Sequence, residues 1–406
     1  MLLLRNPIQP YAWGPVDGIA RLVGSEPTGD HEAELWVGTH PRGPSVISAG
    51  EHEGRTLADL IAEDPARWLG EDLAATGATA LPFLLKVLAI GAPLSLQAHP
   101  SAEQAAAGFA REEAAGIAID APDRNYRDRC PKPEALVAIR DSWTLCGFRR
   151  ADEAGGLLAT LGIDLLRPFV DALEAADDSV ASETAALREL LGWLLRLEEP
   201  ERTELADAVA AATTGAPLEP SGDLRSWVQE LAEAYPGDPL AVAPFILNVL
   251  PLAPGHAIHL RAGNLHAYLR GAGVEIMAAS DNVLRGGLTP KHIDVDELLA
   301  VLHFEPGLPE SPRLGRSGPA ITSYDPGEEA FALAVVQASL GPVEIAPRAP
   351  SLLLATGGSV DIDGPEGPCR LDGGSAAFVT PGSGPYTVSG TGWLWWATTG
   401  NGLPTA

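Results

Sequence analysis

The stretch Leu94-Ser95-Leu96-Gln97-Ala98-His99-Pro100 alternates apolar and polar side chains. If it is a strand, Ser95, Gln97 and His99 share one face, and the leucine and alanine side chains face the other way. A glutamine and a histidine two residues apart on an otherwise apolar strand suit metal chelation. We therefore predict a strand here, with Gln97 and His99 as metal ligands.

Two later segments supply further donors for such a site. Glu134 precedes a short apolar run, and His266 lies in the apolar run 265–269. A carboxylate and a second imidazole would complete four nitrogen and oxygen ligands, which suit a divalent metal, with zinc as the first choice. The alternative is that His266 is a core histidine, and His256 and His259 are the nearest rival ligands.

The composition of the chain argues against several kinds of partner. The chain has 406 residues and a formal net charge of −27, so it should repel nucleic acid and anionic membranes. It has no apolar run approaching the ~18 residues of a membrane span. Its three cysteines form no Cys-x-x-Cys pair, and its first residues are too few for a secretory signal, so we expect a cytoplasmic protein.

Lysine is rare in this chain, which has 24 arginines but only Lys86, Lys132 and Lys291 as lysines. The first two lie close in sequence to proposed metal ligands. Lysine is a compact charge for phosphate, and its pKa shifts readily when the side chain is buried. Lys132 and Glu134 are two residues apart, so an extended chain presents both to one side. Chance placement of a rare residue is the alternative reading.

The apolar pattern divides the chain into a β region, a helical insertion and a second β region. Short apolar runs separated by glycine and proline are typical of strands before residue 151 and after residue 240. Residues 151–240 carry leucines at helical spacing, Ser182 as a candidate N-cap, and 19 acidic against 5 basic side chains. Residues 306–406 return to short strands, which suggest a second jelly roll or sandwich. A jelly roll built from both sides of the insertion would gather the four proposed ligands around one cavity.

The segment from Glu275 to Lys291 indicates an anionic ligand. Arg285 precedes Gly286-Gly287, where the backbone can approach a ligand closely and the guanidinium can bind phosphate through two hydrogen bonds. The alternative is a hairpin turn with a surface arginine. The segment is not a Walker loop, and no Gly-x-Gly-x-x-Gly motif precedes a helix.

Together these motifs resemble those of type I mannose-6-phosphate isomerases, also called phosphomannose isomerases. They occur in one order from residue 1 to about residue 305, whereas the last hundred residues match only in their strand-like pattern. The matching segments are Gln9-Pro10-Tyr11-Ala12-Trp13-Gly14, Ala33-Glu34-Leu35-Trp36-Val37-Gly38-Thr39-His40-Pro41, Phe83-Leu84-Leu85-Lys86-Val87-Leu88, 94–100, Asn125-Tyr126-Arg127-Asp128, Lys132-Pro133-Glu134, 263–269 and 275–291.

The resemblance implies a mainly β protein with a helical insertion. A cupin-like jelly-roll catalytic domain would comprise residues 1–150 and 241–305. An α-helical domain would comprise residues 151–240, and a jelly-roll-like β domain would comprise residues 306–406. The resemblance also implies one zinc ion per chain. Its ligands would be Gln97, His99, Glu134 and His266.

The reaction implied by the resemblance interconverts D-mannose 6-phosphate and D-fructose 6-phosphate through a cis-enediol. Arg285 matches the family's active-site arginine, and Lys132 and Glu275 match its candidate acid–base residues. Either of the last two could be the base, and the sequence does not decide between them. The candidate substrate-binding residues are Ser95, Lys86, Tyr268 and Trp13.

One departure from the family pattern and several alternatives stay open. Cys130-Pro131 stands where the family often has Asn-His, which affects local substrate contacts more than metal binding. The alternatives are isomerisation of a related sugar, a non-catalytic sugar-phosphate-binding protein and a metal-dependent oxygenase. We expect a sugar phosphate as the partner and a monomer or weak homo-oligomer. The product could serve GDP-mannose biosynthesis, or mannose could be a carbon source.

Overall fold

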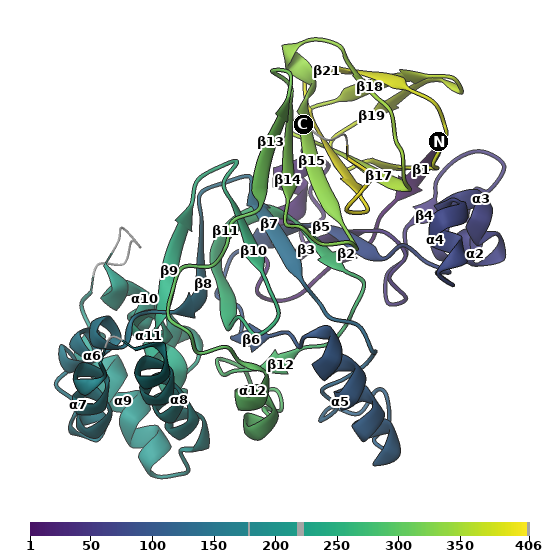
Figure 1. Cartoon of the computed structure of the whole chain (residues 1–406). Coiled ribbons are helices and arrows are strands. Elements are labelled where there is room, and N and C mark those ends of the chain that lie inside the picture. Colours follow the sequence, from purple (N-terminus) through teal and green to yellow (C-terminus); the bar gives the residue numbers. More distant parts are fainter. Residues whose placement is uncertain (178, 217–222, 404–406) are drawn as a thin grey trace.

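The computed structural model describes residues 1–177, 179–216 and 223–403. Figure 1 shows a central β region, a group of helices below it and a second β region above it. The central region uses strands from both before and after the helices, as the sequence predicts for a chain split by an insertion. The division of the chain into three domains stays a prediction.

The central sheet has the strand order β10-β7-β11-β5-β3-β2, and β6, β8, β9 and β12 join it alongside. The long strand β11 organises it, because its C-terminal half pairs with β5 and β7 and its N-terminal half pairs with β6 and β8. The bounds are β2 Ile8–Gln9, β3 Glu34–Val37, β5 Phe83–Ile90, β6 Gln97–Ala98, β7 Glu134–Ala138, β8 Ser142–Phe148, β9 Leu247–Leu252, β10 Ala257–Leu260, β11 His266–Ala278 and β12 Leu284–Arg285.

The predicted strand at 94–99 is shorter in the structure, where only Gln97–Ala98 forms a strand. The reason is that Leu96 pairs with a turn rather than a strand, since its carbonyl accepts from Gly286 N and its N–H donates to Gly287 O. The predicted alternation nevertheless holds for residues 95–98, whereas Leu94, which was predicted on the apolar face, lines the same cavity as Ser95 and Gln97. Leu96 and Ala98 are buried in the core, whereas Ser95 and Gln97 line a cavity.

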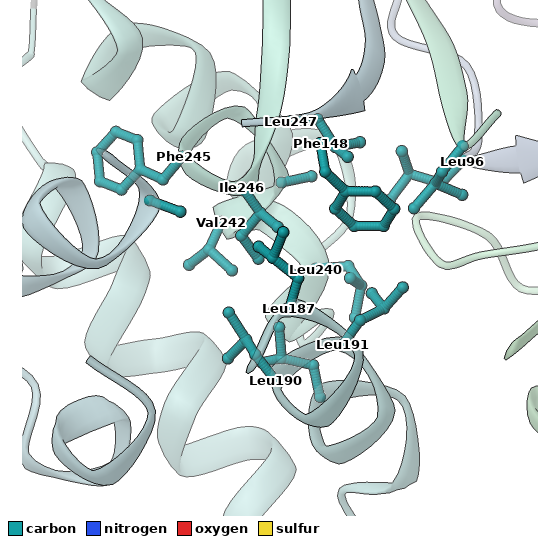
Figure 2. Packing of buried hydrophobic residues seen from close by; sticks show 14 of the residues in the cluster. Leu96, Phe148, Leu187, Leu190, Leu191, Leu240, Val242, Phe245, Ile246 and Leu247 are labelled. Carbon is teal, nitrogen blue, oxygen red and sulfur yellow. The ribbon is translucent and has the colours of Figure 1, made fainter. Parts of the chain in front are cut away.

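The helical insertion packs under the central sheet and shares a core with it. Figure 2 shows Leu187, Leu190 and Leu191 of α8 in one core with Leu240 and with Leu96, which directly precedes β6. The N-cap of α8 is Ser179, which accepts from Ser182 N, so the prediction of Ser182 as the cap was wrong by about one turn. The insertion comprises α6 Ala151–Ala159, η1 Asp164–Leu166, α7 Arg167–Ala175, α8 Val180–Arg196, α9 Glu201–Thr213, α10 Leu224–Ala234, η2 Pro239–Val242 and α11 Ala243–Ile246.

The second β region is a sandwich of an eight-stranded and a four-stranded sheet. The eight-stranded sheet is covered on both faces, by the four-stranded sheet on one side and by the central region on the other. This explains why β17 and β20 are continuous apolar runs rather than alternating ones. The strand orders are β13-β14-β15-β22-β17-β20-β1-β4 and β16-β21-β18-β19.

The bounds of these strands show that two of them come from the N-terminal part of the chain. β1 and β4 pair with the C-terminal sheet, although they fall within the residues predicted for the catalytic domain. The bounds are β1 Leu2–Arg5, β4 Val46–Ile47, β13 Arg313–Ser317, β14 Ile321–Asp325, β15 Ala332–Gln337, β16 Val343–Ile345, β17 Ser351–Thr356, β18 Val360–Gly364, β19 Gly367–Leu371, β20 Ala376–Val379, β21 Tyr386–Gly390 and β22 Trp393–Thr398, with η3 Ala338–Leu340.

The remaining helices lie outside the insertion in sequence. They are α1 Gly18–Val23, α2 Leu57–Glu63, α3 Pro65–Leu69, α4 Glu71–Ala75, α5 Ala102–Ala114 and α12 Val295–Val301. Ser101 and Gln104 form a capping box at the start of α5. Within the part of the chain that the structure describes, no helix has the length and apolar character needed to cross a bilayer.

Candidate metal centre and active-site cavity

Three side chains from different strands meet at one point of the central β region. His99 follows β6, Glu134 begins β7 and His266 begins β11. His99 Nε2 lies 3.3 Å from Glu134 Oε2, and His266 Nε2 lies 3.6 Å from the same oxygen. All three side chains are buried. One ligand atom of each lies within 4.8 Å of the others, so the group could hold one metal ion.

The hydrogen bonds of the two imidazoles determine which nitrogen faces this point. His99 Nδ1 lies 2.8 Å from the carbonyl of Asn282, and His266 Nδ1 lies 3.0 Å from the carbonyl of Asn264. Because a carbonyl only accepts, both Nδ1 atoms donate, and in the neutral ring each Nε2 then presents a lone pair. These two Nε2 atoms and Glu134 Oε2 have no hydrogen-bond partner among the described residues.

The donor set fits zinc. Three buried acceptors that face one another are costly unless a cation satisfies them. Burial, and after it the charge of Lys132, lowers the pKa of His99 to about 4, so this imidazole is neutral at pH 7, as a metal ligand must be. Two imidazoles and a carboxylate are typical zinc ligands, and carbonyls that hold the second ring nitrogen are typical of metal-bound histidine.

Gln97 lies beside this group. In the strand register it is opposite His266 on one side and opposite Arg285 on the other. His266, Gln97 and Arg285 therefore lie side by side on three adjacent strands. The Cα atoms of His266 and Arg285 are about two strand spacings apart, roughly 10 Å. Gln97 also lines the adjoining cavity, and its role as a fourth ligand stays a prediction.

A cavity of about 810 Å³ adjoins the metal centre, and Glu134 lines it. His99 and His266 do not line the cavity but lie behind Glu134, next to its Oε2. The structure thus brings the predicted site residues together around one space, although their individual roles stay predictions. The predicted residues that line the cavity are Trp13, Lys86, Ser95, Gln97, Lys132, Glu134, Tyr268, Glu275 and Arg285.

Lys132 and Glu134 form an ion pair at the edge of the metal centre. Lys132 Nζ lies 2.8 Å from Glu134 Oε1, which leaves Oε2 for the two histidines. Burial opposes ionisation of Glu134, but Lys132 and the two histidines together outweigh it and hold the pKa of Glu134 well below its usual range. The carboxylate is therefore ionised and can bind a cation.

Lys86 is held between two buried carboxylates. Its Nζ lies 3.4 Å from Glu34 Oε2 and 3.3 Å from Glu275 Oε2. Burial opposes the charged form, but Glu34 and Glu275 outweigh it and raise the pKa of Lys86. Tyr268 donates its hydroxyl to Glu275 Oε1 at 2.8 Å. Burial raises the pKa of Glu275, although Lys86 lowers it in part. The result is a rigid, buried charge network in one wall of the cavity.

Another part of the cavity holds three cations without a carboxylate partner. Among the described residues, no ion pair joins Arg127, Arg285 or Lys291 to an acid, although the chain is strongly acidic overall. Arg285 Nη1 donates to Ser95 Oγ at 2.9 Å. Burial, and after it the charge of Arg127, lowers the pKa of Arg285, while the charge of Arg285 is the main cause of the lowered pKa of Lys291. The three cations line the same cavity and their charges act on one another, as expected for a site that takes an anion.

A hydrogen-bonded junction joins the two loops that carry these charges. Asn282 Oδ1 accepts from the N–H groups of Arg127 and Asp128, and its Nδ2 donates to the carbonyls of Asp128 and Cys130. Ser280 Oγ also donates to Asp128. Only the backbone oxygen of Cys130 takes part in the junction with Asn282, so the departure at Cys130-Pro131 leaves this contact intact.

Sequence reasoning missed several residues of the cavity. Glu34, Arg127 and Lys291 line it, as does Asp281, which accepts from His40 and Arg42. Glu34 and Trp36 are two residues apart, as Gln97 and His99 are, so they share one face of a strand. This alternation was the sequence pattern that could have predicted Glu34 in the cavity wall. The contacts of Asp281 and Arg127 depend on loop geometry, which no local pattern specifies.

Comparison with known proteins agrees with this geometry. Residues 1–151 match the catalytic domain of type I phosphomannose isomerase. The chain is 35% identical to mannose-6-phosphate isomerase of Escherichia coli over 399 residues, covering 97% of this chain and 98% of the relative. It has the same identity and coverage with mannose-6-phosphate isomerase of Salmonella typhimurium.

Solved structures agree with the sequence comparison. A zinc-bound mannose 6-phosphate isomerase superposes with a TM-score of 0.88 at 33% identity, covering 98% of this chain and 99% of the other. A mutant of phosphomannose isomerase from Salmonella typhimurium has a TM-score of 0.89 at 33% identity, with the same coverage. The similarity extends over the catalytic region, the helical insertion and the second β region together.

Proposed function

The chain belongs to the type I phosphomannose isomerase family, and we propose that it interconverts D-mannose 6-phosphate and D-fructose 6-phosphate in a zinc-dependent reaction, with the roles set out below. One observation carries the proposal. Three unpartnered metal-binding atoms converge at Glu134, which lines the same cavity as a group of cations that have no carboxylate partner among the described residues. This arrangement suits a six-carbon sugar whose reacting end lies near His99 and Glu134 and whose phosphate lies near Arg285.

The metal centre would be formed by His99, Glu134 and His266, with Gln97 as the proposed fourth ligand. Zinc bound there would polarise the oxygens at C1 and C2 of the sugar as a Lewis acid. Lys132 would stand beside the developing oxyanion as a fixed positive charge, because Glu134 holds its ammonium in place.

The base that moves the proton between C1 and C2 would be Glu275. A base works best when its pKa is near the working pH, and burial raises the pKa of this carboxyl. Tyr268 and Lys86 fix its two oxygens, so that it is oriented before the substrate binds. Lys132 suits the role of base less well, since its Nζ is already paired with Glu134 Oε1. Glu34 would keep Lys86 in place.

The phosphate would bind to Arg285, Arg127 and Lys291, with Ser95 orienting the guanidinium of Arg285. Lys86 was a candidate for this role from the sequence. Its contacts with Glu34 and Glu275 favour a role at the reacting end instead. Trp13 lines the same cavity and would contact the sugar.

The test of the function is isomerase activity on mannose 6-phosphate, measured by coupled detection of fructose 6-phosphate before and after chelation and zinc return. We expect activity to disappear on chelation and to return with zinc.

The test of the base is Glu275→Gln, which should lower kcat by roughly 10²–10⁴-fold with zinc retained. No activity with zinc bound would indicate a related sugar or a binding protein. A cytoplasmic location and a monomeric or weakly oligomeric state stay predictions.

A further inference from the structure

The turn that connects Arg285 to Lys291 has a backbone that a leucine rarely adopts. Leu288, three residues after Arg285, has a φ of +54° and is fully buried. A β-branched or bulky residue is seldom found in this left-handed region unless its surroundings hold it there. The preceding Gly287 has a φ of +113°, so the chain reverses through two successive left-handed residues.

The group that holds this turn comes from the helical insertion. Asp238, just before η2, accepts a 2.7 Å hydrogen bond from Leu288 N with its Oδ2. Its Oδ1 accepts from Leu240 N at 3.0 Å, and Arg202 of α9 lies 3.4 Å from Oδ1. Asp238 is buried. A hydrogen bond from a backbone N–H to a buried carboxylate is among the stronger kinds in proteins.

Packing on both sides of the turn supports the same conclusion. A Cβ added to Gly287 would lie 2.7 Å from Leu240 Cγ, so the backbone of the turn touches the insertion directly. On its other side the turn pairs with Leu96, through Gly286 N to Leu96 O at 2.8 Å and Leu96 N to Gly287 O at 3.1 Å. Figure 2 shows Leu240 and Leu96 in the same core. The turn is thus fixed between the segment 95–97 and the insertion.

We propose that Asp238 is a positioning residue for phosphate binding, and that the helical insertion, through Asp238 and Leu240, sets the positions of Arg285 and Lys291. This inference rests on the proposed phosphate site at those two cations. Without the carboxylate, the N–H of Leu288 loses its acceptor and the left-handed turn relaxes. Arg285 and Lys291 flank the turn, so both charges move relative to Ser95 and the metal centre.

The first test is Asp238→Ala in the zinc-loaded full chain. We expect KM for mannose 6-phosphate to rise roughly 10-fold or more, because small misplacements of binding groups can cost up to about 10²-fold. The inhibition constant of inorganic phosphate should rise in parallel, whereas kcat at saturating substrate changes much less. The matched control is Arg202→Met. It removes the charged partner of Asp238 but keeps the carboxylate that accepts from Leu288 N, so both constants should stay unchanged.

A second pair of variants separates positioning from simple loss of stability. Asp238→Asn keeps one oxygen for Leu288 N, so its KM should lie between those of the wild type and Asp238→Ala, and it serves if Asp238→Ala does not fold. Leu288→Gly removes the conformational cost of the turn, so adding it to Asp238→Ala should restore part of the phosphate affinity, although the loss of a buried leucine lowers Tm further. A merely structural role of Asp238 predicts no such recovery.

Three outcomes would overturn the inference. The first is an unchanged KM and phosphate inhibition constant in Asp238→Ala. The second is a loss confined to kcat. The third is a double variant that binds phosphate no better than Asp238→Ala. Arg285→Ala distinguishes failure of the inference from failure of the proposed phosphate site. If Arg285→Ala leaves phosphate inhibition unchanged, the site itself is wrong; if it weakens phosphate inhibition and Asp238→Ala does not, only the role of Asp238 is wrong.

Discussion

The catalytic β region and the C-terminal β region are both antiparallel, but their interiors differ. Between the two C-terminal sheets the space is filled by apolar side chains, among them Val336, Leu353, Val360 and Trp396. In the central region the strands instead place a glutamine and carboxylates around a cavity of about 810 Å³, with two buried histidines against one of these carboxylates, Glu134. Similar strand architecture therefore supports a site in one region and a packed core in the other, and the difference lies in the side chains.

Buried polar atoms without partners sharpen this comparison. In the catalytic region, His99 Nε2, His266 Nε2 and Glu134 Oε2 lack hydrogen-bond partners among the described residues and converge on one point. In the C-terminal region, the hydroxyl of Tyr386 also lacks a partner among those residues, but it lies within an apolar cluster. Convergent acceptors indicate a bound cation, whereas a solitary hydroxyl indicates only a cost in stability.

The largest effect that the comparison predicts is for His266→Ala. Loss of one of three buried ligands should release zinc and lower kcat/KM by at least ~10³-fold, since a metal supplies several kcal/mol of charge stabilisation. Zinc content by elemental analysis and the coupled assay measure the two effects. The matched variant is Trp396→Phe, in an equally buried position of the other region, which should lower Tm and leave zinc content unchanged. Normal activity in His266→Ala would break the comparison.

The next effect concerns Lys132 at the edge of the metal centre. Lys132→Met keeps the length of the side chain and removes its charge, so turnover should fall by roughly 10²–10⁴-fold, the range of a positioned acid–base or electrostatic group. Zinc content should stay intact, because Lys132 contacts only Glu134 Oε1 and the histidines face Oε2. Turnover near the wild-type value would exclude Lys132 from the reaction.

The two regions also differ in how much the sequence could predict. The alternation of Ser95, Gln97 and His99 with apolar residues predicted metal ligands on one face of the segment. The resemblance to phosphomannose isomerases linked these ligands to Glu134 and His266. The family, the zinc dependence and the mainly β fold with a helical insertion were all predicted and are confirmed. The individual roles of the site residues were predicted too, and the experiments proposed for them are still needed.

What the sequence could not predict are contacts made between loops and between regions. Asp238 bonds to Leu288 across 50 residues, and Asn282 bonds to Asp128 across 154 residues. No local sequence pattern predicts either pair, because both contacts form only when helices, strands and loops that are distant in sequence pack together. The same holds for β1, whose pairing with β20 at the other end of the chain is a long-range contact. Short-range periodicity predicts which face is buried but not which distant segment covers it.

The polar interior of the catalytic region should make its stability sensitive to acid. Burial opposes ionisation of Asp281, but a hydrogen bond from His40 and the charge of Arg42 outweigh it and lower its pKa from 3.8 to about 2. The ionised carboxylate therefore stabilises the fold above about pH 4, and this contribution is lost as the pH falls towards 2. Asp281→Asn should be less stable than the wild type by roughly 1–2 kcal/mol at pH 7.

The measurement is denaturant unfolding of zinc-free protein, wild type and Asp281→Asn, at pH 7 and near pH 3. The difference in free energy of unfolding should shrink at the lower pH, because Asp281 is then largely protonated in the unfolded chain while it is still largely ionised in the folded one, so part of the charge contribution is lost. A difference that stays constant with pH would mean that Asp281 acts through packing rather than charge. Zinc is removed from both proteins so that metal release does not contribute to the pH dependence.

The smallest effect, and of opposite sign, is expected for Tyr386→Phe in the C-terminal region. The hydroxyl of Tyr386 is buried without a partner among the described residues, and such a group costs about 1–3 kcal/mol. Its removal leaves the ring in the apolar cluster, so the free energy of unfolding should rise by about 1 kcal/mol, with kcat, KM and zinc content unchanged. Denaturant unfolding and the coupled assay test both parts. A loss of stability would show that the hydroxyl has a partner, and that an unpartnered polar atom in this protein does not by itself separate a site from a core.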